Sequence, residues 1–580
     1  MTKKRAGGEL VAATLAGLGV TEIFALHGSH LDPLYMACVD YGIRLTDTRH
    51  EAAAGHAADG YARASNGKLG VCAVTAGPGF TNALTAMANA FVDRMPVLFI
   101  AGAAPMREAE ANTLQGGFDA IAMAAPVTKW AHRVTDVERI GEFTHRAVDI
   151  ALSGSPGPVF LELPIDVIFQ PTEQSLPDAK SWTRAAPPAP STATVEALIA
   201  MFQKAKRPVI IAGGGAIITN TASKLKVFSD ITGVPVVASQ KALGILPDDY
   251  PGYVGPAAIL AQAVAAGWSA DAVMLLGARQ GMFLGGAMGA IIPASAYLAQ
   301  VEINAEEIGK VRQADLPIIA DCAVTMDALI AAATKMTWPK DPAWAEKLRA
   351  FRGLGQKAFA DVAPQVRPGV IHPFWAVKAV MDAMPTETTI VADGGEAGNW
   401  VGDMARSPGP GQFLRCGYLG CLGVSSGFAI GAARANPGKP VVCFTGDGAA
   451  GFNIAEFDTM VRHELAIVTI VLNNAEWGMS RNAQNLLYGK NHETIVALTD
   501  THYEAVAQGF GVTSKRIDTY EDIAPAVKTA FASGKPACLN IIIDAQTMHP
   551  RTAMMVGDVS GDDGIPIPYY ANIPKKPATA

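Results

Sequence analysis

Two polar residues toward the end of the chain have the types and spacing of a metal site for a phosphorylated ligand. Asp447 lies between two glycines directly after the apolar run at residues 441–444, and Asn474 follows a second apolar run at residues 467–472. A carboxylate oxygen and an amide oxygen form a hard ligand pair that suits Mg²⁺ shared with phosphate oxygens, not zinc or copper. The flanking glycines let the backbone approach an anion closely. The pattern therefore predicts a site for magnesium and a phosphorylated ligand.

A carboxylate near the start of the chain, Glu51, lies where it could also do chemistry. It opens an alanine-rich helix, expected at residues 51–63, immediately after a strand expected at residues 43–46. The positive end of the helix dipole favours a carboxylate at this position. On its own, however, Glu51 would be interpreted as a helix start without chemistry.

Strands of parallel sheets must position these residues. The two apolar runs at 441–444 and 467–472 bracket a helical pattern, which predicts a strand–turn–helix–strand unit of the α/β kind. Asp447 and Asn474 then emerge at the carboxyl edge of one sheet, where open α/β sheets bind ligands. The same alternation occurs in two earlier parts of the chain. The strands expected there cover residues 23–26, 70–74, 97–100, 159–163, 208–212, 234–237, 272–277 and 298–303.

The chain of 580 residues is too long for one hydrophobic core, and we expect three consecutive α/β domains with mostly parallel sheets. The glycines after residue 212 match a dinucleotide-binding turn only weakly, so the middle domain is interpreted as a scaffold, with a nucleotide or coenzyme A pocket as the alternative. The Gly/Pro-rich end can be a disordered tail or a lid. The expected boundaries are 1–170 for the N-terminal domain, 171–195 for a linker, 196–337 for the central domain, 338–369 for a connector, 370–547 for the third domain and 548–580 for the tail or lid.

The composition argues against several classes of function. Half of the residues are apolar and 17% are charged, which is typical of a well-buried globular protein. The formal net charge is -7 and the only basic run is residues 3–5, so no nucleic-acid partner is expected. The seven cysteines are scattered and form no C-x-x-C pair. We therefore expect neither a disulfide framework nor a zinc site, and a cytoplasmic location fits.

Two apolar segments imitate targeting or membrane segments. The segment after Arg5 is interrupted by Glu9 and repeats its apolar residues at helical spacing, so we expect the first helix of the fold and no signal peptide. The longest apolar segment, residues 253–270, contains Pro256 and Gln262 and is expected to be a buried helix instead of a membrane span. No membrane anchor is therefore expected.

The motifs at both ends of the chain resemble those of thiamine diphosphate (ThDP) enzymes of the pyruvate oxidase/decarboxylase type. The Gly-Asp-Gly and Asn-Asn pairings around Asp447 and Asn474 are similar to the metal-binding motif of that family, and Arg-His-Glu at residues 49–51 is similar to its N-terminal motif. The resemblance implies bound ThDP and Mg²⁺, with Asp447, Asn474 and the backbone carbonyl of Glu476 as metal ligands. It also implies that Glu51 hydrogen-bonds the aminopyrimidine ring and so favours its imino tautomer.

The resemblance also implies the rest of the cofactor pocket and the assembly. In this family one domain grips the pyrimidine, and the third domain of a partner chain grips the diphosphate. This implies a homodimer or homotetramer with active sites at the dimer interface. Leu422 corresponds to the large apolar residue that forces the bent conformation of the cofactor. The residues implied to contact the cofactor are Thr75, Gly77, Gly394, Gly395, Gly420, Leu422, Gly446, Asp447, Gly448, Ala449, Asn474, Glu476, Trp477, Gly478 and Met479.

Within this superfamily the chain is similar to the benzaldehyde lyase branch. The likeness begins at residues 27–32 and continues through residues 112–115. It implies that His30 and Gln115 lie near the reactive carbon of the cofactor, with Ser29 beside them. A neutral imidazole and an amide there can pass protons to and from the substrate. Either could instead be a core polar group whose hydrogen bonds are satisfied.

The implied activity is that of a carbon–carbon lyase and carboligase acting on 2-hydroxy ketones and aldehydes. Ser29 stands where that branch has alanine, and its hydroxyl would create polar space suited to a carboxylate. Ile165, Gly398 and Cys416 stand where the branch has bulky or aromatic pocket residues, so an aryl-lined pocket is not assured. Two alternatives stay open. One is a 2-hydroxyacyl-CoA lyase that releases formyl-CoA and an aldehyde or ketone, and the other is a 2-keto acid decarboxylase or acetolactate-synthase-like enzyme.

Overall fold

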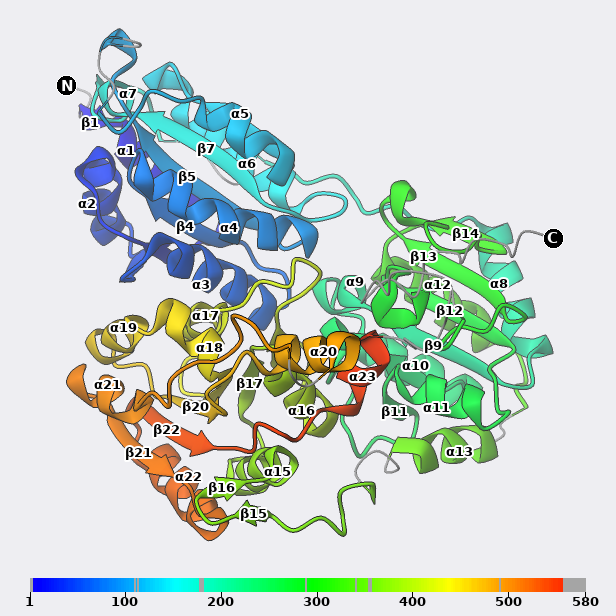
Figure 1. Cartoon of the computed structure of the whole chain (residues 1–580). Coiled ribbons are helices and arrows are strands. Elements are labelled where there is room, and N and C mark those ends of the chain that lie inside the picture. The colour runs from blue at the N-terminus through cyan, green and yellow to red at the C-terminus, as the bar shows by residue number, and fades with distance from the viewer. Residues whose placement is uncertain are drawn as a thin grey trace, which may run out of the picture.

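The computed structural model of the chain describes residues 4–108, 111, 114–176, 182–286, 289–339, 342–352, 357–489 and 492–556. Three six-stranded sheets organise these residues, one in each third of the chain. In Figure 1 the N-terminal domain (blue and cyan) lies above the third domain (yellow to red), and the central domain (green) lies to one side of both. Every pair of neighbouring strands in the three sheets is parallel, which confirms the expected fold class.

The N-terminal sheet has the strand order β3-β2-β4-β5-β7-β6. Its inner strands β2, β4 and β7 are buried along their whole length, and β5 is buried except at its last residue, as the uninterrupted apolar runs predict. Helices α1, α2 and α6 cover one face, while α3, α4 and α5 cover the other. The elements are α1 (Gly7–Gly17), β2 (Glu22–Ala25), α2 (Asp32–Asp40), β3 (Arg44–Asp47), α3 (Glu51–Ala64), β4 (Gly70–Val74), α4 (Pro78–Val92), β5 (Val97–Ala103), α5 (Ala120–Ala124), β6 (Trp130–Arg133), α6 (Ile140–Leu152), β7 (Val159–Pro164) and α7 (Ile165–Ile168).

The central sheet has the order β11-β10-β9-β12-β13-β14, so its strand order reverses between β9 and β12. Helices α8, α10 and α12 pack on one face, and α11 and α13 pack on the other. The elements are α8 (Thr192–Lys204), β9 (Pro208–Ala212), α9 (Gly214–Ile218), α10 (Ala222–Thr232), β10 (Val236–Ala238), β11 (Tyr253–Pro256), α11 (Ile259–Ala265), β12 (Ala272–Leu276), β13 (Tyr297–Glu302), β14 (Leu316–Ile319), α12 (Cys322–Ala333) and α13 (Pro342–Arg352).

The third sheet has the order β18-β17-β19-β20-β22-β21. Helices α15, α16 and α22 pack on one face, and α17, α19 and α21 pack on the other. The elements are α15 (Pro373–Ala383), β17 (Thr389–Ala392), α16 (Glu396–Met404), β18 (Phe413–Arg415), α17 (Ser425–Ala435), β19 (Val441–Gly446), α18 (Asp447–Ala450), α19 (Glu456–Arg462), β20 (Ile467–Asn473), α20 (Gly478–Tyr488), α21 (Tyr503–Gly509), β21 (Thr513–Ile517), α22 (Ile523–Ala532), β22 (Ala537–Ile542) and α23 (Pro550–Val556).

Two local expectations are wrong. The apolar segment 253–270 is not one helix, because it folds as the edge strand β11 followed by the short helix α11. Gly255 adopts a φ of 115°, a value that no helix contains, and this breaks the pattern at its start. The stretch after Asp447 is also divided, into α18, a 3₁₀ turn at Gly451–Asn453 and α19, instead of one long helix.

The N-terminal and third domains contact each other most closely through helices α3 and α17. A Cβ added at Gly60 would lie 2.5 Å from the Cα of Phe428, and one added at Gly431 would lie 2.1 Å from the carbonyl oxygen of Ala57. The two helix backbones therefore touch, and only glycine fits at these points. Apolar side chains of both domains continue from this contact as one buried cluster.

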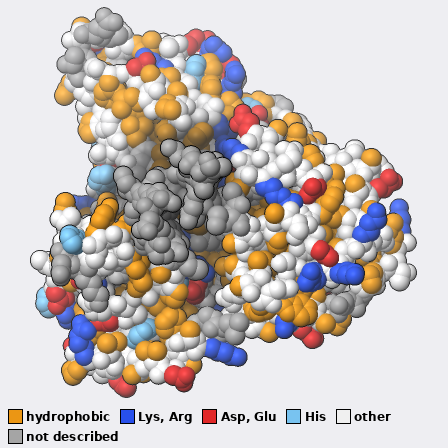
Figure 2. All heavy atoms as spheres, turned by 45° about the vertical axis from the view of Figure 1, so that its right-hand side comes forward, with side chains coloured by type: hydrophobic (Ala, Val, Ile, Leu, Met, Phe, Trp, Pro, Cys, Tyr) orange, Lys and Arg blue, Asp and Glu red, His pale blue; other side chains and the backbone are white. Residues whose placement is uncertain are grey.

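Within the described ranges, no helix has both the length and the apolar composition needed to cross a membrane. Figure 2 shows the three domains as separate lobes, and basic side chains are scattered among acidic ones over the face in view. All seven cysteines are free. The expected tail is described only as far as residue 556, and residues 557–580 lie outside the described residues.

Candidate active site

The carboxyl edge of the third sheet brings Asp447 and Asn474 together. Strand β19 ends at Gly446 and β20 ends at Asn473, so both residues directly follow neighbouring parallel strands. The Oδ2 atom of Asp447 and the Oδ1 atom of Asn474 each accept a hydrogen bond from the backbone N–H of Glu476, at 3.2 Å in both cases. The two oxygens therefore converge on one point, as a shared ligand requires.

The charge on Asp447 has no partner among the described side chains. Its carboxylate is 3% exposed and accepts backbone N–H groups, with Gly448 at 2.9 Å, but no lysine, arginine or histidine pairs with it. Burial raises the pKa of Asp447 to about 6. A buried carboxylate is costly unless it is paired or binds a metal ion. The isolated carboxylate beside an amide oxygen therefore fits a divalent cation such as Mg²⁺.

The backbone around these ligands is shaped for close approach. Ala475, directly after Asn474, has a φ of 57°, a strained value for a residue with a side chain. Gly420 has a φ of 68°, and an added Cβ there would meet nothing within 4 Å, so the loop opens onto free space. A Cβ at Gly448 would instead lie 2.5 Å from the ring of Trp477.

A cavity of about 1360 Å³ lies between this edge and the central domain. The residues expected to bind the cofactor in the third domain all line it. These residues are Gly394, Gly395, Gly420, Leu422, Gly446, Asp447, Gly448, Ala449, Asn474, Glu476, Trp477, Gly478 and Met479.

The carboxyl edge of the N-terminal sheet gathers a second set of candidates. The Nδ1 atom of His30 lies 3.1 Å from the Oγ1 atom of Thr75, which follows β4. Burial lowers the pKa of His30, which favours its neutral form. Gln115 has a φ of 55°, and a Cβ at Gly77 would lie 2.8 Å from the Cα of Gln115, so these backbones also touch. Ser29 lies beside His30 and is exposed.

Glu51 is held at the start of α3. Its side chain is 8% exposed, and the Nδ2 atom of Asn82 donates a hydrogen bond to its Oε2 atom at 3.0 Å. The preceding residue, His50, caps the helix by accepting from the N–H of Ala52 at 3.1 Å. Helix α4, which carries Asn82, begins just after the turn that contains Thr75. The two parts of this N-terminal set are thus linked through α4.

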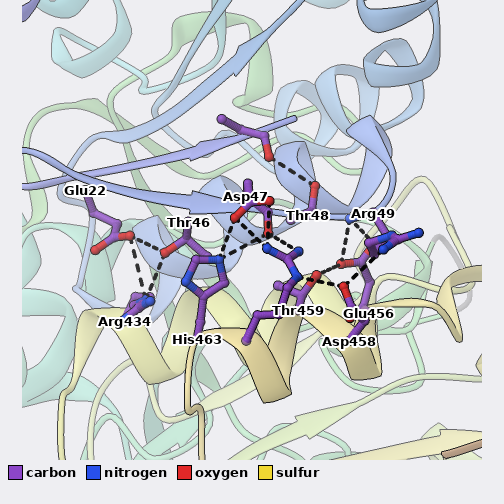
Figure 3. A network of polar contacts seen from close by, with 12 residues as sticks. Glu22, Thr46, Asp47, Thr48, Arg49, Arg434, Glu456, Asp458, Thr459 and His463 are labelled. Carbon is purple, nitrogen blue, oxygen red and sulfur yellow. Dashed lines mark hydrogen bonds and ion pairs between the residues drawn. The ribbon is translucent and has the colours of Figure 1, made fainter. Parts of the chain in front are cut away.

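A polar network from the third domain fixes the segment that precedes Glu51 (Figure 3). Glu456 on α19 is fully buried, and its two carboxylate oxygens accept the N–H of Arg49 at 3.1 and 3.2 Å. The hydroxyl of Thr459 donates to the same carboxylate at 2.6 Å. Burial raises the pKa of Glu456 to about 7.

Further contacts in the same network join β3 to α17 and α19. Asp47 pairs with Arg462 at 2.7 Å and accepts from the Nε2 atom of His463 at 2.9 Å. The Nε atom of Arg434 donates to the hydroxyl of Thr46 at 2.9 Å. Sequence reasoning does not identify Glu456 as a site residue. The available signal was a glutamate that begins a helix shortly after the Gly-Asp-Gly turn and has a threonine three residues later.

The two sets of candidates do not meet in the 1360 Å³ cavity. Ser29, His30, Glu51, Thr75, Gly77 and Gln115 are absent from the lining of the 1360 Å³ cavity, as far as the structure describes the chain. One sheet edge therefore carries the candidate metal and phosphate ligands, and another carries the candidate carboxylate, imidazole and amide.

Family comparisons agree with this division. Models of the thiamine pyrophosphate enzymes match the chain in three parts: the N-terminal TPP binding domain at residues 5–123, the central domain at 195–329 and the C-terminal TPP binding domain at 393–541. The chain belongs to the thiamine pyrophosphate enzyme family. Thiamine pyrophosphate is ThDP, so the expected family and its ThDP-binding domains are confirmed. Glu51 and its neighbours lie in the N-terminal TPP binding domain, and Asp447 and Asn474 lie in the C-terminal one.

Relatives with two different activities cover nearly the whole chain. An acetolactate synthase large subunit of Mycobacterium tuberculosis is 30% identical over 546 residues, which cover 94% of this chain and 97% of the relative. The 2-hydroxyacyl-CoA lyase 2 of Homo sapiens is 32% identical over 582 residues, which cover 93% and 90%. A probable acetolactate synthase large subunit of Methanocaldococcus jannaschii is 30% identical, covering 94% and 93%. These thiamine pyrophosphate enzymes do not single out one substrate.

The central TPP enzyme domain offers little room for a nucleotide at the point where its strand order reverses. A Cβ at Gly213, after β9, would lie 2.1 Å from the carbonyl oxygen of Gly277, after β12. The cavity at this place measures about 140 Å³. Ligand pockets usually measure upward of ~300 Å³. The geometry therefore argues against a nucleotide at this point of the central domain, although other residues of the domain line the 1360 Å³ cavity.

Proposed function

We propose that the protein is a ThDP- and Mg²⁺-dependent carbon–carbon lyase and carboligase that acts on 2-hydroxy carbonyl compounds. The observation that carries this proposal is the pair of complementary half-sites. The third domain has an uncompensated buried carboxylate, Asp447, beside the amide oxygen of Asn474. The N-terminal domain has the buried Glu51 and the His30–Thr75 pair.

The candidate residues have separate roles in cofactor binding and proton transfer. Asp447, Asn474 and the carbonyl of Glu476 would hold Mg²⁺ and, through it, the diphosphate. ThDP, when bound, supplies a nucleophilic carbon and an electron sink for the bond beside the substrate carbonyl. The Glu51 carboxyl would exchange a proton with the pyrimidine ring nitrogen of the bound cofactor, and its burial would keep competing water away. His30 is neutral and can accept or return the proton of the substrate hydroxyl, with Gln115 orienting that oxygen.

The complete site requires two chains. One chain places its metal ligands in the 1360 Å³ cavity and its Glu51 outside that cavity. A second copy would bring its own Glu51, His30 and Gln115 to the open side of the loop at Gly420. We therefore propose a homodimer or homotetramer with active sites at the dimer interface.

Two substrate classes compete within this reaction type. Neutral 2-hydroxy ketones are favoured by His30 and Gln115, the two residues of the N-terminal set that follow the benzaldehyde lyase pattern. A 2-hydroxyacyl-CoA is favoured by the cavity, whose volume of about 1360 Å³ exceeds what a small ketone needs, and by the likeness to 2-hydroxyacyl-CoA lyase 2. Acetolactate synthase relatives keep 2-keto acids as a third class.

A substrate panel separates these classes. Benzoin, a 2-hydroxyacyl-CoA, pyruvate and benzoylformate would each be supplied with ThDP and Mg²⁺, and kcat/KM compared. We expect cleavage of the 2-hydroxy compounds, abolished when ThDP is omitted or when EDTA is added. Turnover of pyruvate or benzoylformate alone would show a decarboxylase or synthase. A purified protein that turns over nothing in the panel at saturating ThDP and metal would contradict the proposal.

A further inference from the structure

Arg415 lies in a groove that two glycines make on helix α16. It is the last residue of β18, the edge strand of the third sheet. A Cβ added at Gly398 would lie 3.1 Å from its Nη2 atom, and one added at Gly402 would lie 3.3 Å from its Nη1 atom. Gly398 and Gly402 are one turn apart on the same helix face. The guanidinium therefore occupies the space that side chains at these positions would otherwise fill.

The positive charge of Arg415 has no anionic partner in the described part of the chain. Its Nη2 atom donates to the neutral Oδ1 atom of Asn399 at 2.9 Å, and no carboxylate forms an ion pair with it. Burial lowers the pKa of Arg415, but a guanidinium stays protonated throughout the physiological range. Arg415 is half-buried, and a charge that is partly removed from water without a counter-charge is costly, so an anion that enters from solvent would be stabilised here.

Two other arginines at the cavity wall already have carboxylate partners. Arg352 pairs with Asp248 at 2.5 Å. Arg551 on α23 pairs with Asp403, which also accepts from His549 at 3.0 Å. Asp403 and the Cys416 thiol favour the positive charge of Arg415 electrostatically, whereas Arg551 disfavours it. The surroundings of Arg415 therefore leave its positive charge without full compensation.

Arg415 faces the same cavity as the metal-binding edge. Helix α16 begins directly after Gly394-Gly395, and Arg415 is followed by the loop that leads to Leu422. Arg415, Gly395, Leu422 and Asp447 all line the 1360 Å³ cavity. Gly398 is also one of the positions where the benzaldehyde lyase pattern has a bulky pocket residue. The guanidinium thus lies in the region where the substrate would extend from the cofactor.

We propose that Arg415 binds an oxyanion of the substrate and makes this site selective for anionic substrates. The anion is either the carboxylate of a 2-keto or 2-hydroxy acid or a phosphate of a coenzyme A thioester, both of which match the planar donor fork of arginine. This inference rests on the proposed function, because it takes the cavity to be the substrate site. Gly398 and Gly402 act as the cradle that positions the guanidinium.

Binding measurements test the proposal independently of turnover. Titration calorimetry of the ThDP- and Mg²⁺-loaded protein would use oxamate as the carboxylate probe, coenzyme A as the phosphate probe and benzamide as the neutral probe. We expect Arg415→Met to raise the Kd of one anionic probe by roughly 10- to 100-fold, the loss that removing a hydrogen-bonded charge produces. The affinities for benzamide and ThDP should not change. The probe whose affinity falls shows whether the site binds a carboxylate or a coenzyme A phosphate. Arg415→Lys should fall between the two proteins.

Two further variants control the result. Arg406→Met removes the same charge from an exposed side chain of the same wall and should leave both anionic probes within about twofold of wild type. Gly398→Ala keeps Arg415 but crowds its guanidinium, and should weaken the same probe as Arg415→Met to a smaller extent.

Three outcomes would overturn the proposal: no anionic probe binds the wild-type protein, Arg415→Met binds both probes normally, or it loses ThDP to the same degree. The substrate panel tests the proposed function independently of this anion site. If wild-type protein turned over nothing while Arg415→Met still lost oxamate or coenzyme A binding, the proposed function would fall and the anion site would stand.

Discussion

At the residue scale, three buried carboxyl groups serve the site in different ways. Asp447 faces the cavity without a cation, so its charge is available to a metal ion. Glu51 is held by one amide, Asn82, and keeps one oxygen for a ligand. Among the described residues, Glu456 accepts hydrogen bonds from the backbone N–H of Arg49 and from the hydroxyl of Thr459, contacts that hold the segment before Glu51.

Replacing Glu51 with glutamine tests its role directly. Glu51→Gln keeps the size and the contact with Asn82 but cannot exchange the proton of the pyrimidine ring. We expect kcat to fall by roughly 10²- to 10⁴-fold for every substrate, the usual contribution of general acid–base catalysis, with ThDP and Mg²⁺ affinity retained by calorimetry. Glu142→Gln, on an exposed face of α6, is the matched control. Wild-type turnover by Glu51→Gln would refute the assignment.

The sequence was sufficient for some of these residues and not for others. Asp447 and Asn474 could be placed because each directly follows an apolar run, and strand ends in parallel sheets meet at one edge. Arg415 could not be predicted, because its importance depends on how β18 approaches two glycines on α16. Glu456 was missed for the same reason, since its partner lies 407 residues away in the chain.

At the scale of elements, α3 is fixed from both ends by the third domain. Its start is held by Glu456 on α19, and its later turns touch the backbone of α17 at Gly60 and Gly431. If Glu51 acts on the cofactor as proposed, its helix needs such support, because a small misplacement of a catalytic group costs much of the rate.

The titration of Glu456 gives a pH-dependent prediction. Burial raises its pKa from 4.5 to about 7 in the folded chain. The folded state therefore loses stability as pH rises through about 7, by an amount on the order of 3 kcal/mol relative to pH below 4.5. The Glu456→Gln side chain cannot titrate and therefore does not undergo this loss. Between pH 5 and 8, the free energy of unfolding of wild type should fall relative to that of Glu456→Gln. Urea denaturation at several pH values measures this shift.

Asp458→Asn on the same helix is the control. Burial opposes ionisation of Asp458, but its ion pairs with Arg462 and Arg49 lower its pKa overall. The stabilisation that ionised Asp458 gives the folded state is fully present above pH 3.8 and is lost only at lower pH. The free energy of unfolding of Asp458→Asn relative to wild type should therefore show no trend between pH 5 and 8. An equal trend in both variants, or none in Glu456→Gln, would show that Glu456 does not titrate as stated.

Element boundaries were predicted well where apolar runs are short and closed by glycine or proline, as at β4, β9 and β19. The errors at 253–270 and after Asp447 arose where composition stayed apolar or helical while the backbone turned. A positive φ at Gly255 and the turn at Gly451–Asn453 decide these places, and neither leaves a periodic signal.

At the scale of the whole molecule, the proposed site is built from two chains. Co-expression of Glu51→Gln with Asp447→Ala would test this. Each variant alone damages both sites of a dimer, but a mixed dimer has one site with both defects and one site with none. Random pairing should therefore restore roughly a quarter of the wild-type turnover. Recovery near zero, with mixed dimers verified by two affinity tags, would place the whole site within one chain.

The bare contact between α3 and α17 has a practical consequence for anyone who wishes to change what this enzyme accepts. The two main chains meet there without side chains between them. A larger residue at Gly60 or Gly431 would clash with the backbone of the other helix and destabilise the folded state. The β18–α16 wall, in contrast, is filled by a single long side chain resting on glycine. A library for altered substrate scope therefore belongs at positions 398, 402 and 415.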